Sequence, residues 1–401
     1  MPASPSTGNQ RSYRLTAIDM LRGLAVVIMA IDHVRDGFLA GAVQDPTHDP
    51  NVGPALFATR WITHYCAPVF VTLAGTSAGL MIGRKSAPEL FRFLLTRGLW
   101  LLFVEVAIIS TALTFAPTGI PQFGGHVLLV MQVIWAIGAS MIVLAFAQRL
   151  GRPVCFALGA TILATHNALD AIWPATRIMG PSAPLWTIFH SQISTTGGPF
   201  LFIFAYPLLP WIGVMLFGFG SAGVFERPPA ERDRILLRAG LAMTGAFVVL
   251  RAIDRYGDPN HWETQARGVV GTVIDFLNTT KYPPSLLFML MTLGPAAIVC
   301  SQADRMTGRL KDTLVMFGRV PFAFYVAHFY LIHVLALALG VAQGFGPGQM
   351  LTVFMFYPKG YGVPLAGVYA VWAIVIATLY PLCRWVAGVK ARRRDWWLSY
   401  L

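Results

Sequence analysis

The residues best suited to chemistry form one short cluster, Asp32-His33-Val34-Arg35-Asp36. On a helix, side chains three or four residues apart share a face, so these charged groups can contact one another. A carboxylate beside an imidazole fixes its tautomer and raises its basicity, as general-base catalysis requires. The alternative is a self-neutralising cluster that stabilises a helix end. We favour a function, because ionisable groups in an apolar span are costly.

Two further histidines follow this cluster closely. His48 lies in a polar stretch, and His64 comes after Arg60 and Trp61 at the start of the next apolar run. A short connection makes two helices antiparallel neighbours, so His64 is expected at a depth similar to that of His33. The candidate catalytic residues are therefore His33, Asp32, Asp36, His64 and His48, with solvated or capping histidines as the alternative for the last two.

The opposite end of the same helix carries Asp19 and Arg22, which are three residues apart. Arg22 and His33 are eleven residues apart, about 1,100° of helical rotation, so they lie within roughly 20° of one face and about 16 Å apart along the axis. A guanidinium can hold a phosphate group by its rigid fork. An interfacial arginine paired with Asp19 is an equally weighted alternative.

A later apolar run places polar groups at helical spacing: Tyr325, His328, Tyr330 and His333. They could line a cavity or form interhelical hydrogen bonds, and the sequence leaves both open. Lys281 precedes a helix start marked by two prolines.

The composition determines the elements that must position these residues. Of the 401 residues, 56% are hydrophobic and 12% charged, against about 45–50% and about 25% in soluble domains. Apolar runs of a length that crosses a bilayer recur along the chain, which predicts an all-α, polytopic membrane bundle of about ten helices. The expected helices are 17–42, 61–83, 98–117, 126–148, 154–172, 199–224, 236–253, 284–302, 317–340 and 363–386. They form one transmembrane domain, 17–386, between an N-terminal tail, 1–16, and a basic tail, 387–401.

The distribution of Lys and Arg predicts the orientation. Twenty of the 30 fall on one side of this bundle and seven on the other, so the positive-inside rule places both termini in the cytoplasm. The net charge of +12 is then explained by anchoring beside anionic lipid, without nucleic acid. The first helix is expected to stay uncleaved. Eight of the nine histidines fall in the outer half or the outer loops, which indicates work on the outer face.

Other patterns argue against soluble-enzyme chemistry. The four cysteines lie in apolar runs without ligand spacing, so neither a disulfide framework nor a metal site is expected. Gly75-Thr76-Ser77-Ala78-Gly79 matches a nucleophile elbow, but that motif requires a strand before a helix. Gly75, Gly79 and Gly83 at a spacing of four predict a helix-packing seam instead.

Several blocks together resemble a known family. They are Arg14-x-x-x-Ile18-Asp19-x-x-Arg22-Gly23 with Met29 and Asp32-His33-x-Arg35-Asp36, then Trp61-Ile62-Thr63-His64-x-Cys66-Ala67-Pro68, Lys281-Tyr282-Pro283-Pro284-Ser285-Leu286 and Gly318-Arg319-Val320-Pro321. This pattern is similar to that of the transmembrane acyltransferase superfamily, and specifically to bacterial relatives of heparan-alpha-glucosaminide N-acetyltransferase, in its catalytic domain.

The resemblance implies transfer of an acetyl or other acyl group from cytoplasmic acetyl-CoA or another acyl-CoA to a sugar or other amine or hydroxyl. The acceptor would be a glycan or lipid-linked sugar on the outer face of a bacterial inner membrane, and the protein could be a homodimer. Substrate-binding candidates are Asp19, Arg22, Arg35, Arg60, Lys281, Tyr325 and His328. The family's catalytic histidine lies in the outer loop where His48 stands, with His33 and His64 as alternatives. Direct transfer and an acyl-histidine intermediate both remain open.

Two other classes of function compete with an acyltransferase. A transporter or permease for a sugar or anionic metabolite would also explain a polytopic bundle, but no clear internal repeat is visible, and the outward bias of the histidines counts against it. A scaffold without turnover would require the Asp32 to Asp36 cluster to be structural only.

Overall fold

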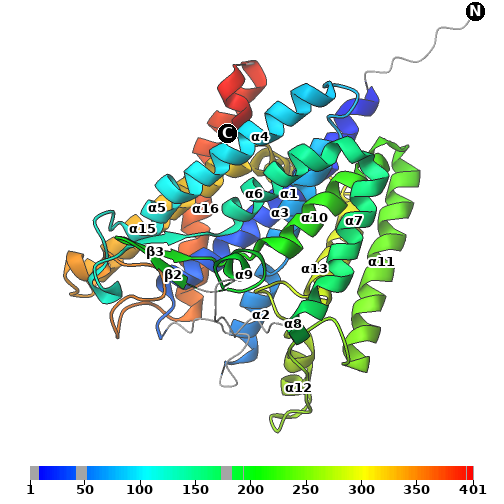
Figure 1. The fold of residues 1–401 in the computed structure, drawn as a ribbon. Coiled ribbons are helices and arrows are strands. Elements are labelled where there is room, and N and C mark those ends of the chain that lie inside the picture. The colour runs from blue at the N-terminus through cyan, green and yellow to red at the C-terminus, as the bar shows by residue number, and fades with distance from the viewer. Residues whose placement is uncertain (1–8, 42–51, 173–182, 193, 394, 401) are drawn as a thin grey trace, which may run out of the picture.

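The structure, a computed structural model, describes residues 9–41, 52–172, 183–192, 194–393 and 395–400 (Figure 1). It is mostly helical, at 73%. The helices are α1 (Asn9–Phe38), α2 (Pro54–Thr63), α3 (Cys66–Gly79), α4 (Ala87–Val104), α5 (Ser110–Thr114), α6 (Val133–Ala147), α7 (Gly151–Thr165), α8 (Leu169–Ile172), α9 (Ala183–Phe189), α10 (Leu208–Gly220), α11 (Pro229–Ile253), α12 (Gly268–Leu277), α13 (Leu286–Gln302), α14 (Arg309–Arg319), α15 (Pro321–Ala342) and α16 (Leu365–Arg392). The strands are β1 (Val127–Val130), β2 (Ser194–Gly197) and β3 (Phe200–Ile203).

Six helical segments of the described chain are long and apolar enough to cross a membrane. They are Ala87–Thr114, Val133–Ile172, Leu208–Glu226, Pro229–Ile253, Pro321–Ala342 and Leu365–Arg392. Helix α13 is apolar but shorter, α3 has 14 residues, and α1 carries many charges. A membrane bundle is therefore shown, whereas the count of ten spans and the side of the termini stay predictions.

The expectation of helix throughout was wrong at two places. Residues 126–148 and 199–224 were expected to be helical, but α6 begins only at Val133 and α10 only at Leu208. Before each helix lies a strand, and β3 pairs parallel with β1 and antiparallel with β2. A short apolar run has no period that separates strand from helix, so hydropathy could not find these strands. Their ladder pairs backbone groups that no helix pairs at these positions.

Several other boundaries also differ from expectation. Helix α1 begins at Asn9, within the expected N-terminal tail, and α4 begins at Ala87 where residue 98 was expected. The helix expected over 61–83 is divided into α2 and α3 at His64 and Tyr65. The last helix extends to Arg392, into the expected tail, because Lys and Arg are good helix formers and favour a helix C-terminus.

Helix α1 runs through the middle of the bundle, while α11 lies at its edge (Figure 1). Helix α1 packs against α2, α3, α13, α14, α15 and α16. The start of α1 and the end of α16 lie at one end of the bundle, and α2 and α12 lie at the opposite end (Figure 1).

Two glycines allow α1 and α14 to approach within backbone contact. A Cβ atom on Gly318 would lie 1.7 Å from the carbonyl oxygen of Asp19, and one on Gly23 would lie 1.8 Å from that of Leu314. No larger residue fits at either position without separating the helices. The contact brings Gly318, and with it Arg319, beside the Asp19 and Arg22 pair.

The glycines of α3 form the packing seam that the sequence predicts. A Cβ atom on Gly75 would lie 2.2 Å from the carbonyl oxygen of Met215, and one on Gly79 would lie 2.6 Å from that of Phe219, both on α10. The third glycine, Gly83, was wrongly included, because it lies in the following turn with φ +84°.

A buried carboxyl group anchors the start of α6. Glu105 lies in a π-helical turn, Glu105–Ile109, and its Oε2 accepts a 2.7 Å hydrogen bond from the backbone N–H of Trp135. The backbone N–H groups of Gln132 and Ile134 also bond to this carboxyl group. The first N–H groups of a helix have no partner within the helix, so Glu105 caps α6 from α4.

The glycine contact between α1 and α14 predicts that an alanine at this contact destabilises the protein, whereas an alanine at a glycine in open space does not. Gly318→Ala should lower the melting temperature of the purified protein in detergent by several degrees, since overpacking costs about 1–3 kcal/mol. Gly245→Ala on α11 is the matched control, because a Cβ atom there meets nothing within 4 Å. Equal melting temperatures for the two variants, measured by tryptophan fluorescence, would show that the close contact is absent.

Candidate functional site

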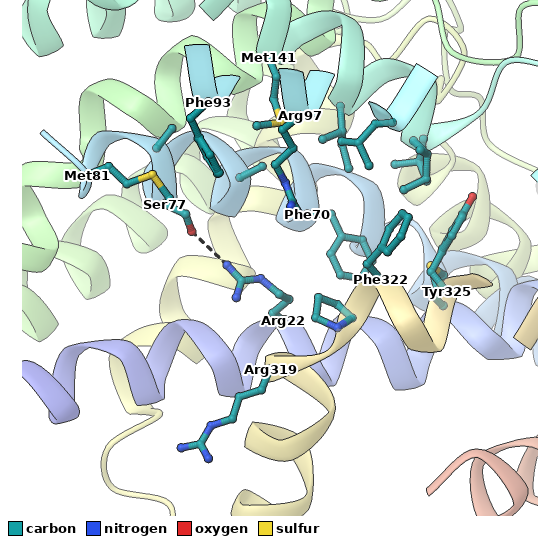
Figure 2. A pocket seen from close by; sticks show the side chains of 18 of the residues that line it. Arg22, Phe70, Ser77, Met81, Phe93, Arg97, Met141, Arg319, Phe322 and Tyr325 are labelled. Carbon is teal, nitrogen blue, oxygen red and sulfur yellow. Dashed lines mark hydrogen bonds between the residues drawn. The ribbon is translucent and has the colours of Figure 1, made fainter. Parts of the chain in front are cut away.

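Two cavities lie on the same side of α1. The large cavity has a volume of about 320 Å³ and is shown in Figure 2. The small cavity has a volume of about 30 Å³. Its walls include Asp32, His33, Thr63, Gln132 and Lys281.

Three residues line both cavities, one from each of three helices. They are Met29 of α1, Phe70 of α3 and Val133 of α6, and we call them the neck. Arg22 lines the large cavity and His33 the small one, so the helix face that the two residues are predicted to share borders both cavities.

The large cavity is cationic at one end. Arg22, Arg97, Arg319 and Lys390 line it, contributed by α1, α4, α14 and α16, and no carboxylate is among its lining residues. Figure 2 shows Arg22 in the centre, hydrogen-bonded to Ser77, with Arg319 extending away from it. Such a set of cations suits a ligand with several negative charges.

The expected pair of Asp19 and Arg22 forms and positions Arg22. Arg22 Nη1 donates to Asp19 Oδ1 at 3.1 Å, and Arg22 Nη2 donates to Ser77 Oγ at 3.0 Å. Asp19 Oδ2 is also 3.8 Å from Arg319 Nε, and Lys390 Nζ donates to the carbonyl oxygen of Arg319 at 3.2 Å. These contacts link Arg22, Arg319 and Lys390, three of the four cations that line the large cavity.

The other end of the large cavity is apolar apart from one hydroxyl group. Phe322 and Tyr325 lie there beside the neck. Tyr325 is 4% exposed, and its hydroxyl group has no hydrogen-bond partner within the described residues. It is therefore a donor that a ligand in this cavity can use.

His33, which lines the small cavity, contacts a second histidine, His328, which lies outside the lining of that cavity. His33 Nδ1 lies 2.6 Å from His328 Nε2, and His328 Nδ1 contacts the carbonyl oxygens of Phe324 and Tyr325. A carbonyl oxygen can only accept, so in the neutral ring His328 Nδ1 carries the proton and Nε2 accepts. His33 Nδ1 then donates to His328, which leaves the lone pair of a half-buried His33 on Nε2.

The acidic residues near His33 are held by arginines. Asp32 accepts from Arg60 in a very short contact and lies 3.2 Å from Arg35 Nη2. Arg35 also donates to Asp36, at 3.1 Å from Nε. Of the contacts predicted within the cluster, the one between Asp32 and Arg35 forms, whereas Asp36 pairs with its neighbour Arg35 and not with His33. Within the described residues, no carboxylate is hydrogen-bonded to His33. The structure gives the role of orienting His33 to His328, which the sequence placed only among binding residues.

The remaining candidates are spread over different positions. Lys281 lines the small cavity and is 6% exposed. His64 is buried with its ring centroid 5.3 Å from that of Phe288, next to Thr63 but outside the lining of either cavity. His48 lies outside the described residues. The imidazole of His333 hydrogen-bonds to the carbonyl oxygens of Ala112 and Met350. Of the two roles that the sequence left open, it thus has interhelical hydrogen bonding and not the lining of either cavity.

Sequence reasoning missed several lining residues. Arg97 and Lys390 were counted only as charges for orientation, because they look like any other basic residue at a helix end. Arg319 had a signal, since it stands in the Gly318-Arg319-Val320-Pro321 block. Gln132 and Tyr206 of the small cavity carried no signal beyond polarity.

The arrangement suits transfer of a group from a polyanionic donor. The cations can hold the anionic part, and a base with an available lone pair lies beyond the neck. Among the described residues, no group of three His, Cys, Asp or Glu side chains has the geometry of a metal site.

Comparison with known proteins agrees with this geometry. A search of curated proteins finds no match. Residues 14–250 match the family model described as heparan-alpha-glucosaminide N-acetyltransferase, catalytic, a stretch that contains the Asp19 and Arg22 pair, His33 and the whole neck. Because the match spans more than half of the chain, this protein belongs to the heparan-alpha-glucosaminide N-acetyltransferase catalytic family.

Proposed function

We propose that this chain is a transmembrane acyltransferase that binds acyl-CoA in the large cavity and transfers its acyl group at His33. One observation carries the proposal. The cationic cavity and the imidazole of His33, whose Nε2 lone pair is available, lie on either side of the three neck residues. Membership of an N-acetyltransferase family supports the same reaction.

The donor chemistry fits the large cavity. Coenzyme A carries a diphosphate and a further phosphate, which require several cations, and Arg22, Arg97, Arg319 and Lys390 supply them. The thin pantetheine arm, which ends in the thioester, suits the apolar wall that leads to the neck.

The residues around the neck account for the chemical step. His33 Nε2 takes the proton of the acceptor amine or hydroxyl, whose lone pair attacks the thioester carbonyl carbon. The negative charge moves to the carbonyl oxygen, for which the Tyr325 hydroxyl group is an available donor. When the intermediate collapses, the carbon–sulfur bond breaks, and the proton on His33 neutralises the departing thiolate.

A covalent route uses the same atoms. His33 Nε2 attacks the thioester carbonyl carbon first, the carbon–sulfur bond breaks, and coenzyme A leaves as the thiolate. The acceptor then attacks the acyl group, displaces the histidine and gives its proton to the thiolate. On either route His33 becomes transiently cationic. The His33 Nδ1–H bond to His328 Nε2 strengthens with that charge, so His328 acts as a positioning and stabilising residue.

The direction of transfer follows from the charge distribution. With the N-terminus of α1 in the cytoplasm, the cationic end opens to the cytoplasmic donor and His33 faces the outer half of the bilayer. The acceptor would then be a glycan or lipid-linked sugar outside a bacterial inner membrane.

Removing the base should abolish transfer. In nanodiscs with radiolabelled acetyl-CoA and glucosamine as a test acceptor, His33→Ala should lower coenzyme A release at least 100-fold, the usual contribution of a general base. His328→Ala should lower it less, and His328→Gln should restore part of it by accepting at the same place.

His261→Ala is the matched control, since His261 is 65% exposed and pairs with Asp254 on a loop. Unchanged activity in His33→Ala, with normal folding by melting temperature, would remove His33 from the mechanism. Label appearing on the wild-type protein but not on His33→Ala would favour the covalent route.

The cavity cations should determine donor affinity. Arg97→Ala and Lys390→Ala should each weaken coenzyme A binding about tenfold by calorimetry, because a hydrogen bond to a charged group contributes about 1.5–3 kcal/mol. Arg234→Ala, an exposed change on α11, should leave the affinity as it is. Equal affinities in all three variants would place the donor elsewhere.

A further inference from the structure

We infer that the neck residues Met29, Phe70 and Val133 determine acyl-chain length and admit an acetyl group while rejecting longer chains. The inference rests on the proposed function and deepens it, because neither the family match nor the sequence assigns residues that select the acyl group.

The neck is the place where the two cavities meet. Each of its residues lines both cavities, and each comes from a different helix. Met29 is 5% exposed and Val133 7% exposed, and Phe70 is half-buried. Met29 precedes His33 by one helical turn on α1, so a group that reaches His33 from the large cavity must pass this side chain.

The volumes limit what can lie beyond the neck. The small cavity holds about 30 Å³, against about 320 Å³ on the cationic side. The small cavity thus has about one tenth of the volume of the large one, so the number of non-hydrogen atoms in the acyl group decides whether the group fits. An acetyl group has three, a methyl carbon, a carbonyl carbon and an oxygen. A butyryl group adds two methylenes, which would meet the walls of the small cavity or the neck.

The walls of the small cavity are held in place. Asp32 is held by Arg60 and Arg35, and His33 by His328. Tyr206 packs on Tyr282 with ring centroids 5.3 Å apart. A longer chain would therefore have to displace the neck itself.

The helices that carry the neck are also fixed. Helix α1 is in backbone contact with α14 at Gly23 and Gly318, and α3 with α10 at Gly75 and Gly79. The start of α6, where Val133 lies, is anchored by Glu105. Side chains on rigid elements select by size more sharply than side chains on loops do.

The test compares acetyl-, propionyl-, butyryl- and hexanoyl-CoA by kcat/KM. One methylene in a fitted pocket changes this ratio roughly 10- to 200-fold, so the wild type should prefer acetyl-CoA over butyryl-CoA at least 100-fold. Phe70→Ala removes the largest neck side chain and should lower that preference at least tenfold. Met29→Ala should act in the same direction.

Phe322→Ala is the matched control, because Phe322 also lines the large cavity but is not part of the neck. It should leave the preference for acetyl-CoA as in the wild type, whatever its effect on the rate. Equal use of acetyl- and butyryl-CoA by the wild type, or equal shifts in Phe70→Ala and Phe322→Ala, would overturn the inference alone. A protein that binds coenzyme A but turns over none of the four thioesters would overturn the proposed function as well.

Discussion

The structure depends on the need to pair the charged groups that α1 carries between Asp19 and Asp36 inside an apolar bundle. An unpaired charge at that depth is expensive, so each one must meet a partner from another element or from its own helix. Asp32 forms an ion pair with Arg60 of α2. Arg22 donates hydrogen bonds to Ser77 of α3 and to the carbonyl oxygen of Gly318 on α14. Other helices thereby converge on α1 at two places, around Arg22 and around Asp32. Arg22 lines the large cavity and Asp32 the small one, so the charges that are costly to bury also organise the site.

The same constraint explains why small residues recur around the site. Hydrogen bonds between a helix and the backbone of its neighbour require close approach, which Gly23 and Gly318 permit. Ser77, which stood inside the misleading nucleophile-elbow match, contributes a hydroxyl group to Arg22, and the flanking Gly75 packs against α10. The segment is thus both a packing surface and one wall of the large cavity.

Much of this could be predicted from residue types and spacing along one helix. The contact between Asp32 and Arg35, the Asp19 and Arg22 pair and the shared face of Arg22 and His33 all follow from the geometry of a helix. The strands β1 and β3 could not be predicted, because a four-residue apolar run fits strand and helix equally well.

Contacts between distant segments were the other limit. His33 and His328 are 295 residues apart, and Arg97 and Lys390 come from α4 and α16. Their meeting depends on how helices pack, which charge counts and periodicity do not contain. A nearby carboxylate was the reasonable candidate to orient His33, but local arginines hold both carboxylates, and the imidazole turns to His328 instead.

The most direct test of the central claim is a cryo-EM structure with an acetyl-CoA analogue in which a methylene replaces the thioester sulfur. The account predicts phosphates against Arg22 and Arg97 in the large cavity, with the acetyl group beyond Met29 and in contact with His33. Reacting groups come within about 3–3.5 Å in a productive complex, so the acyl end should lie at about that distance from His33 Nε2 or one acceptor atom away. An analogue bound outside the large cavity, or bound there with its acyl end directed away from the neck, would contradict the account.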